Sequence, residues 1–258
     1  MAYDEENAKL ITEKYDEVDH MHDQLILKLS LFRSKLANEK AAEYLMQGVG
    51  RRLKIITKCL HNIFRIFPIE KTDLLPRDDL TDLDINLHAF FINISGILDN
   101  LAWVFVCEKD LFGNPKEGKI DKYGVGLFNE ETQTRLKPEL NEYLKSNRMQ
   151  SWYTEYSKNY RDALAHRIPL YVPPAALNDK EKEEYLLLEK QLWDFNSLKS
   201  IPEHDELHEK LSSLGRACPF FTHSHNEGSK PLFLHAQIIV DFMTIDDIIN
   251  KFCDYCMQ

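Results

Sequence analysis

The sequence LDINLHAFFINISGILDNLAWVFV, residues 83–106, decides the fold, because it is the most apolar run in the chain. Its apolar side chains recur every three or four residues, which places them on one face of a helix; they are Leu83, Leu87, Phe91, Ile94, Leu98 and Leu101. Polar residues interrupt the run at Asp84, Asn86, His88, Asn93, Asp99 and Asn100. A membrane-spanning helix needs about 20 predominantly apolar residues. We therefore expect a buried helix, begun by a capping box of Thr81 and Asp84.

Helical spacing continues towards the amino terminus. One long helix is predicted from the run of Tyr15, Val18, His22, Leu25, Leu29 and Phe32. A second is predicted from Leu45, Val49, Leu53, Ile56, Leu60 and Phe64, and Pro68 should end it. Gly48 and Gly50 lie within this second pattern without the spacing of a phosphate-binding loop. Close packing is the expected reason for these two glycines.

A third helical region begins near Pro138, where Trp152, Tyr156, Tyr160 and Leu164 recur every four residues. Pro169 disfavours helical geometry at the residue before it, so this helix should end near His166 or Arg167. A short extended segment is expected over residues 168–172. Asn178 and Glu181 then form a capping box for a charged helix that runs to about Leu198.

The carboxyl-terminal part predicts a small β element. Residues 217–222, the turn-rich NEGSKP at 226–231, and residues 232–243 have the order of a hairpin. In the second strand the apolar residues alternate with more polar ones; they are Leu234, Ala236, Ile238, Val240 and Phe242. Thr244 and Asp247 should cap a final helix. The glycine-rich segment 112–128 should be an exposed loop.

The fold class expected is therefore mostly α: a helical bundle with a small β-hairpin near the carboxyl terminus. A chain of 258 residues fits a single domain. Within it we expect a helical core at residues 10–170 and an extension at residues 171–258. The acidic amino-terminal sequence is unlike a secretory signal, which predicts a cytoplasmic protein without a membrane anchor.

The net charge and the cysteine content limit which classes of function the chain can have. A net charge of -10 argues against a protein that coats nucleic acid indiscriminately, because such binding neutralises many phosphates. Five cysteines, an odd number, are expected to be reduced thiols. Cys253 and Cys256 form a C-x-x-C pair that could bind zinc with Cys218, His223 or His225. That spacing matches no familiar zinc module, so no metal and no cofactor are expected.

The sequence RDALAH, residues 161–166, is the best candidate for chemistry. Its histidine should lie at the carboxyl end of a helix, where the helix dipole favours the protonated imidazole. Asp162, four residues earlier, could hydrogen-bond that imidazole. Arg161 carries a permanent charge suited to phosphate oxygens. The group fits RNA cleavage without a metal, in which a base activates a 2'-hydroxyl that attacks the adjacent phosphorus.

The surrounding residues favour an anionic substrate. Five basic residues and two acidic residues lie between 145 and 167 in a chain that is acidic overall. Lys158, Arg167 and Arg148 are the basic candidates for RNA contact, and Tyr160 is a candidate for stacking on a base. Two structural alternatives remain open. Arg161 and His166 could simply close the helix through a carboxylate and a terminal carbonyl, and the tyrosine stripe could belong to the core.

The string NYRDALAHR, residues 159–167, resembles the R-[polar]-x3-H signature of the HEPN superfamily, the higher eukaryote and prokaryote nucleotide-binding domains. The resemblance implies a helical bundle, commonly a homodimer. It also implies a metal-independent endoribonuclease of the kind found in toxin–antitoxin and phage-defence systems, with Arg161 and His166 as the catalytic pair and Asp162 as the polar residue that supports them.

Other members of that superfamily have lost catalysis, and this suggests an alternative to the endoribonuclease function. The chain would then be a catalytically inactive HEPN-like module that binds a nucleotide, an antitoxin or another protein partner. The segment 179–210 holds ten acidic and five basic residues, a balance that could face a basic partner. A solvated helix face would have the same composition.

Overall fold

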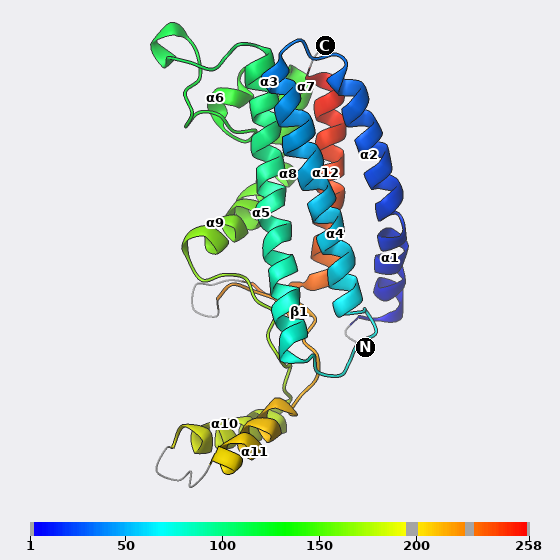
Figure 1. Ribbon diagram of the computed structural model, residues 1–258, viewed down its shortest axis with the longest axis vertical. Helices are drawn as coiled ribbons and strands as arrows, with labels where there is room; N and C mark the ends of the chain where they lie inside the picture. Colours follow the sequence, from blue (N-terminus) through cyan, green and yellow to red (C-terminus); the bar gives the residue numbers. More distant parts are fainter. Residues whose placement is uncertain (1–2, 195–200, 225–229, 257–258) are drawn as a thin grey trace.

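The computed structural model describes residues 3–194, 201–224 and 230–256 and is mostly α-helical (Figure 1). Long helices lie side by side: α1 (Glu5–Asp16), α2 (Val18–Arg33), α4 (Gly50–Ile66), α5 (Arg77–Glu108) and α12 (Leu234–Tyr255). A two-stranded antiparallel sheet, β1 (Phe220–Phe221) and β2 (Leu232–Phe233), pairs Phe220 with Phe233 and Phe221 with Leu232. The predicted fold class, a helical bundle with a small β element near the carboxyl terminus, is confirmed.

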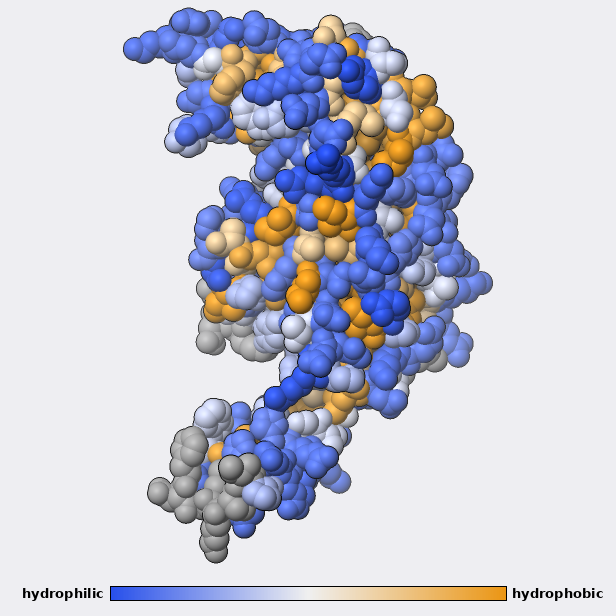
Figure 2. All heavy atoms as spheres, viewed as in Figure 1, coloured by the Kyte–Doolittle hydropathy of each residue, from blue (hydrophilic) through white to orange (hydrophobic). Residues whose placement is uncertain are grey.

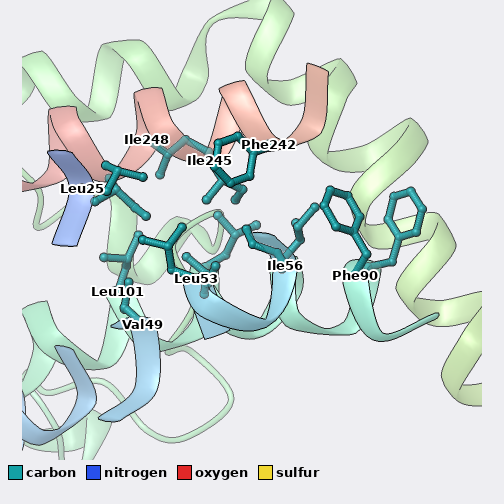
Figure 3. Packing of buried hydrophobic residues seen from close by; sticks show 14 of the residues in the cluster. Leu25, Val49, Leu53, Ile56, Phe90, Leu101, Phe242, Ile245 and Ile248 are labelled. Carbon is teal, nitrogen blue, oxygen red and sulfur yellow. The ribbon is translucent and has the colours of Figure 1, made fainter. Parts of the chain in front are cut away.

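The core lies between α2, α4, α5 and α12. Figure 3 shows apolar side chains from all four helices meeting there, among them Leu25, Leu53, Phe90 and Ile245. Each of these four side chains is at most 1% exposed. Apolar area removed from water contributes roughly 25 cal/mol per Å², so this contact between helices is the main source of stability for the bundle.

Helix α5 is the central element expected from the apolar run. All six residues of its predicted buried face are buried. The helix begins at Arg77, however, one turn earlier than predicted, with Asp78 and Asp79 in its first turn. The predicted capping box is wrong: the Thr81 hydroxyl donates to the carbonyl of Arg77, and the Asp84 carboxylate accepts from the backbone N–H of Val172, 2.9 Å away.

Helix α5 is also long and apolar enough to cross a membrane, alone among the described helices in that respect. In its most apolar window, 61% of the residues are buried inside the bundle. Such burial is typical of the core helix of a soluble protein, which agrees with the interpretation of the polar interruptions.

The amino-terminal patterns are confirmed with one change. The predicted long helix is divided at Glu17 into α1 and α2. The second pattern falls on the π-helical turn η1 (Tyr44–Val49), which follows α3 (Glu39–Glu43), and on α4, which ends at Ile66, just before Pro68. Gly48 packs against α5, because a Cβ there would lie 2.7 Å from the side-chain oxygen of Asn100. Close packing is therefore its role.

The predicted second strand is wrong over residues 234–243, which form the first half of α12. No new helix starts at Thr244, whose hydroxyl donates to the carbonyl of Val240 within the continuous helix. The buried face repeats at three and four residues through Ile238, Phe242 and Ile245. Helix α12 therefore packs in the bundle core, although the expected helical core ended at residue 170.

The middle of the chain holds short elements and a projecting arm. The loop over 112–128 contains only the 3-10 turn η2 (Pro115–Glu117), as expected. It is followed by α6 (Glu130–Gln133), α7 (Pro138–Lys145), α8 (Asn147–Ser151), the π-helical turn η3 (Trp152–Ser157) and α9 (Lys158–His166). Helices α10 (Asp179–Trp193) and α11 (Ile201–Ser212) project from the bundle (Figure 1). The capping box of Asn178 and Glu181 is confirmed; Leu198 lies outside the described residues.

Candidate functional site

Helix α9 carries the RDALAH sequence and ends where the sequence predicted, at His166. The residues that follow run back along α5, because two α5 side chains bind their backbone. Asp84 accepts from the N–H of Val172, and His88 Nε2 bonds the carbonyl of Leu170. Tyr171 also forms an antiparallel bridge with Thr222. The carboxyl end of α9 is thus tied to the central helix (Figure 1).

Arg161 forms an ion pair with the residue beside it. Its Nη1 atom lies 3.0 Å from Oδ1 of Asp162, and each side chain is about one third exposed. Arg161 therefore pairs with a carboxylate, as expected if its role is to close the helix. The support of the His166 imidazole by Asp162 stays a prediction.

The charge of Arg161 also reaches Asp99 on α5. Although part of the Asp99 side chain reaches the surface, lost hydration raises the pKa of its carboxyl, while Arg161 and Arg52 act to lower it. Tyr153 of η3 lies in the same group: burial raises the pKa of its phenol, and its ring stacks on Phe128 with the centroids 4.1 Å apart. The structure therefore brings Arg161 together with Asp162, Asp99 and Tyr153.

His166 lies apart from this group. Its side chain is exposed, and among the described residues it makes none of the hydrogen bonds or ion pairs of the fold. Because α9 stays helical through His166, five residues separate it from Arg161 by about 140° around the helix axis. The two side chains thus leave α9 on different faces.

The four candidates for RNA contact differ in accessibility. Lys158, Arg148 and Arg167 are exposed, and Arg167 also donates to the carbonyl of Asn159, 3.1 Å away. Tyr160 is only 3% exposed and packs edge-on against Phe91, with the centroids 5.2 Å apart. A base cannot stack on this ring, and the prediction that Tyr160 contacts RNA is therefore wrong. Tyr160 instead belongs to the core, which was the structural alternative for the tyrosines of this helix.

A cationic groove lies between η1, α4 and α5 and was not predicted from the sequence. It encloses about 510 Å³. Its centre is Arg52, whose Nε donates to Oδ1 of Asn100 at 3.1 Å and whose Nη1 donates to Oδ1 of Asn93 at 2.9 Å. The groove is lined by Lys40, Glu43, Tyr44, Gln47, Gly48, Arg51, Arg52, Ile55, Asn93 and Asn100. Three of these residues are cations and one is an anion.

Two glycines make room for this arrangement. A Cβ on Gly96 would lie 2.4 Å from Cζ of Arg52, so the guanidinium rests directly on the backbone of α5. Gly48 gives the same close approach to Asn100. The sequence did hold a signal: Asn93, Gly96 and Asn100 are three and four residues apart and share one helix face.

The thiols and histidines form no candidate metal centre in the part of the chain that the structure describes, since no three metal-binding side chains gather there. Cys253 in α12 and Cys256 directly after it are buried, and burial raises the pKa of each thiol to about 12. Thiolates, not thiols, bind metals. Cys218 is also buried, and His225 lies outside the described residues.

The face of the molecule in Figure 2 is largely hydrophilic and is hollowed on both sides of the α9 region. Figure 1 shows α5 between α4 and α9. The two π-helical turns of the described chain adjoin the two arginine sites, η1 beside Arg52 and η3 beside Arg161. Such turns are frequent at functional sites.

Comparison with known proteins gives no relative: no protein-family model matches the chain, and no curated protein and no solved structure is significantly similar to it. The resemblance to the HEPN superfamily therefore rests on the residues of α9 and stays a prediction.

Proposed function

We propose that this protein is a HEPN-like, metal-independent endoribonuclease that acts as a homodimer in the cytoplasm. The observation that carries the proposal is the placement of RDALAH at the end of α9, with Arg161 paired to Asp162 and near Asp99 of α5, and with His166 exposed. A role in a toxin–antitoxin or phage-defence system follows only from the resemblance and belongs to the same proposal.

In this reaction a base removes the proton of a 2'-hydroxyl, the freed oxygen attacks the neighbouring phosphorus, and the 5'-oxygen leaves with a proton. His166 moves the protons, because an imidazole titrates near neutral pH. Arg161 binds the phosphoryl oxygens as negative charge builds on them. Asp162 keeps the Arg161 guanidinium in place through their 3.0 Å ion pair.

A homodimer reconciles this mechanism with the geometry of a single α9. Because Arg161 and His166 leave the helix about 140° apart, one helix cannot present both to the same phosphate without a large change. Two α9 helices that face each other across a shared cleft can pair the arginine of one protomer with the histidine of the other. Light scattering on the purified protein should give the mass of a dimer; a monomer would contradict the shared cleft.

The direct test is cleavage of a single-stranded RNA in EDTA by the wild type, Arg161→Ala and His166→Ala. We expect loss of cleavage in both variants, since each removes one half of the catalytic pair. Arg65→Ala is the matched control, because Arg65 is an exposed arginine in the last turn of α4, outside the candidate site, and should leave cleavage nearly unchanged. Equal cleavage by all four proteins would reject the assignment.

One observation favours the second candidate, a catalytically inactive module that binds a protein partner. Helix α10 has no buried residue, and three of its large apolar side chains are more than half exposed: Leu186, Leu187 and Trp193. Large apolar side chains that gather on an exposed surface can mark an interaction site. This candidate holds if RNA stays intact while a partner co-purifies with the wild type and is lost in Leu187→Asp.

A further inference from the structure

The cationic groove at Arg52 is built differently from the site at Arg161. In the groove the arginine is held by two uncharged amides, Asn93 and Asn100, which accept hydrogen bonds without cancelling its charge. The amide nitrogen of Asn93 donates to the carbonyl of Ala89, 2.7 Å away, so its oxygen is fixed towards the guanidinium. The arginine is thus oriented in advance of any ligand.

Part of the Arg52 guanidinium is left for a ligand. Hydrogen bonds occupy Nε and one N–H of Nη1, and Nη2 has no partner among the described residues. The side chain is half-buried at the wall of a 510 Å³ groove. A planar guanidinium with free N–H groups in one plane suits two oxygens of a phosphate.

The other residues of the groove favour the same class of ligand. Lys40 and Arg51 add two exposed positive charges, and Glu43 is the single acidic residue of the lining. Gln47 supplies a further amide, and the half-buried ring of Tyr44 is backed by the parallel ring of Trp103, with the centroids 5.6 Å apart. An aromatic wall beside cations is a common surface for a nucleotide.

We infer that the groove between α4 and α5 binds a phosphate group of an RNA strand through Arg52, so that the strand crosses α5 towards Arg161. This inference rests on the proposed ribonuclease function for its choice of ligand. Asp99 of α5 is close enough to both Arg52 and Arg161 to feel the charge of each, so the two arginines lie near one another across α5. A phosphate held at Arg52 would restrict where the scissile bond lies relative to α9.

The test measures binding apart from cleavage. Fluorescence anisotropy of a labelled single-stranded oligoribonucleotide is titrated in EDTA on a His166→Ala background, with and without Arg52→Gln. We expect Arg52→Gln to weaken binding about tenfold and to reduce the slope of log affinity against log salt by about 1, as for one lost phosphate contact. Lys58→Gln is the matched control: it removes an exposed charge from α4 outside the groove and should change affinity little.

A second variant keeps the test informative if Arg52→Gln fails to fold. Arg51→Gln alters an exposed groove residue and should weaken binding by about threefold while leaving thermal unfolding unchanged. AMP, titrated in parallel, distinguishes a free nucleotide from an RNA strand as the source of the phosphate. If either ligand binds more weakly to the groove variants than to Lys58→Gln, the phosphate site is supported, and the responding ligand identifies the source. If neither responds, the inference is overturned.

The outcome also separates this inference from the proposed function. RNA that is bound through Arg52 but never cut would keep the phosphate site and reject the ribonuclease. RNA that is cut with the same KM and kcat by the wild type and by Arg52→Gln would keep the ribonuclease and reject the phosphate site.

Discussion

Asp241 offers the sharpest test of the fold, because its carboxyl is buried in the bundle with an incomplete set of partners. Its Oδ1 accepts from Nε1 of Trp152 at 2.8 Å and from Nε2 of Gln237 at 2.9 Å. Its Oδ2 has no partner among the described residues. Burial raises the pKa of Asp241 to about 7, although both hydrogen bonds act to lower it.

This shift makes Asp241 a pH-dependent cost to the folded state. A carboxyl whose pKa is higher in the folded than in the unfolded state favours folding while it is protonated, and that contribution disappears as the pH rises towards the folded pKa. Between the ordinary value of 3.8 and about 7, the free energy of unfolding falls by about 1.4 kcal/mol per pH unit. The loss from pH 5 to pH 8 is about 3 kcal/mol.

Asp241→Asn should remove this loss. The Asn oxygen can still accept from Trp152 and Gln237, and the amide nitrogen takes the place of the unpartnered oxygen without carrying a charge. Urea unfolding at several pH values should show the variant gaining about 3 kcal/mol on the wild type between about pH 5 and about pH 8. Asp254→Asn, which replaces an exposed carboxylate on the same helix, is the control. A constant difference between Asp241→Asn and wild type across this range would refute the reasoning.

Three further predictions can be checked by the same unfolding measurements. Phe221→Ala should cost about 3–5 kcal/mol, because this ring is fully buried against Phe91. Leu187→Ser should change stability by less than about 0.5 kcal/mol, because that side chain is 65% exposed. Burial lowers the pKa of His235 from 6.5 to about 4, so its contribution is present above about pH 6.5 and falls by about 3 kcal/mol as the pH drops towards 4. His235→Gln should lose less stability than wild type over that acid range.

The helices that could be predicted from the sequence are those with one long apolar face. In α5 the spacing of Leu83 and its partners agrees only with a helix, and the polar interruptions fall on the other faces. The ends of helices could also be predicted where they depend on interactions between residues close together in the chain. Asn178 and Glu181 begin α10 through contacts along the chain, and Pro169 ends α9 for steric reasons.

Helix α12 could not be predicted in this way, because its apolar residues satisfy two periods at once. Leu234, Ile238 and Phe242 lie at intervals of four, which is a multiple of two and also close to one helical turn. The alternation needed Ala236 and Val240 as buried partners, but Val240 is 50% exposed. Packing of α12 against the other helices decided between the two periods, and that information is tertiary.

The groove at Arg52 was hidden for a related reason. Asn93 and Asn100 were visible as polar breaks in an apolar helix, yet their partner lies 41 and 48 residues earlier on α4. A single sequence gives no means of joining residues at that separation. The Arg161 site, by contrast, could be proposed because its residues are neighbours in the chain.

The two arginine sites differ in how much charge they can offer to a phosphate. Arg161 is paired with one carboxylate and lies near a second, Asp162 and Asp99, so a phosphate approaching it meets two negative charges beside the positive one. Arg52 also feels Asp99, but neutral amides hold its guanidinium, and Lys40 and Arg51 stand nearby. Neutral acceptors orient a guanidinium without screening it, whereas a carboxylate does both. Under the proposed ribonuclease function, an anionic strand should therefore be held mainly at Arg52, and Arg161 should act at the bond that changes charge during cleavage.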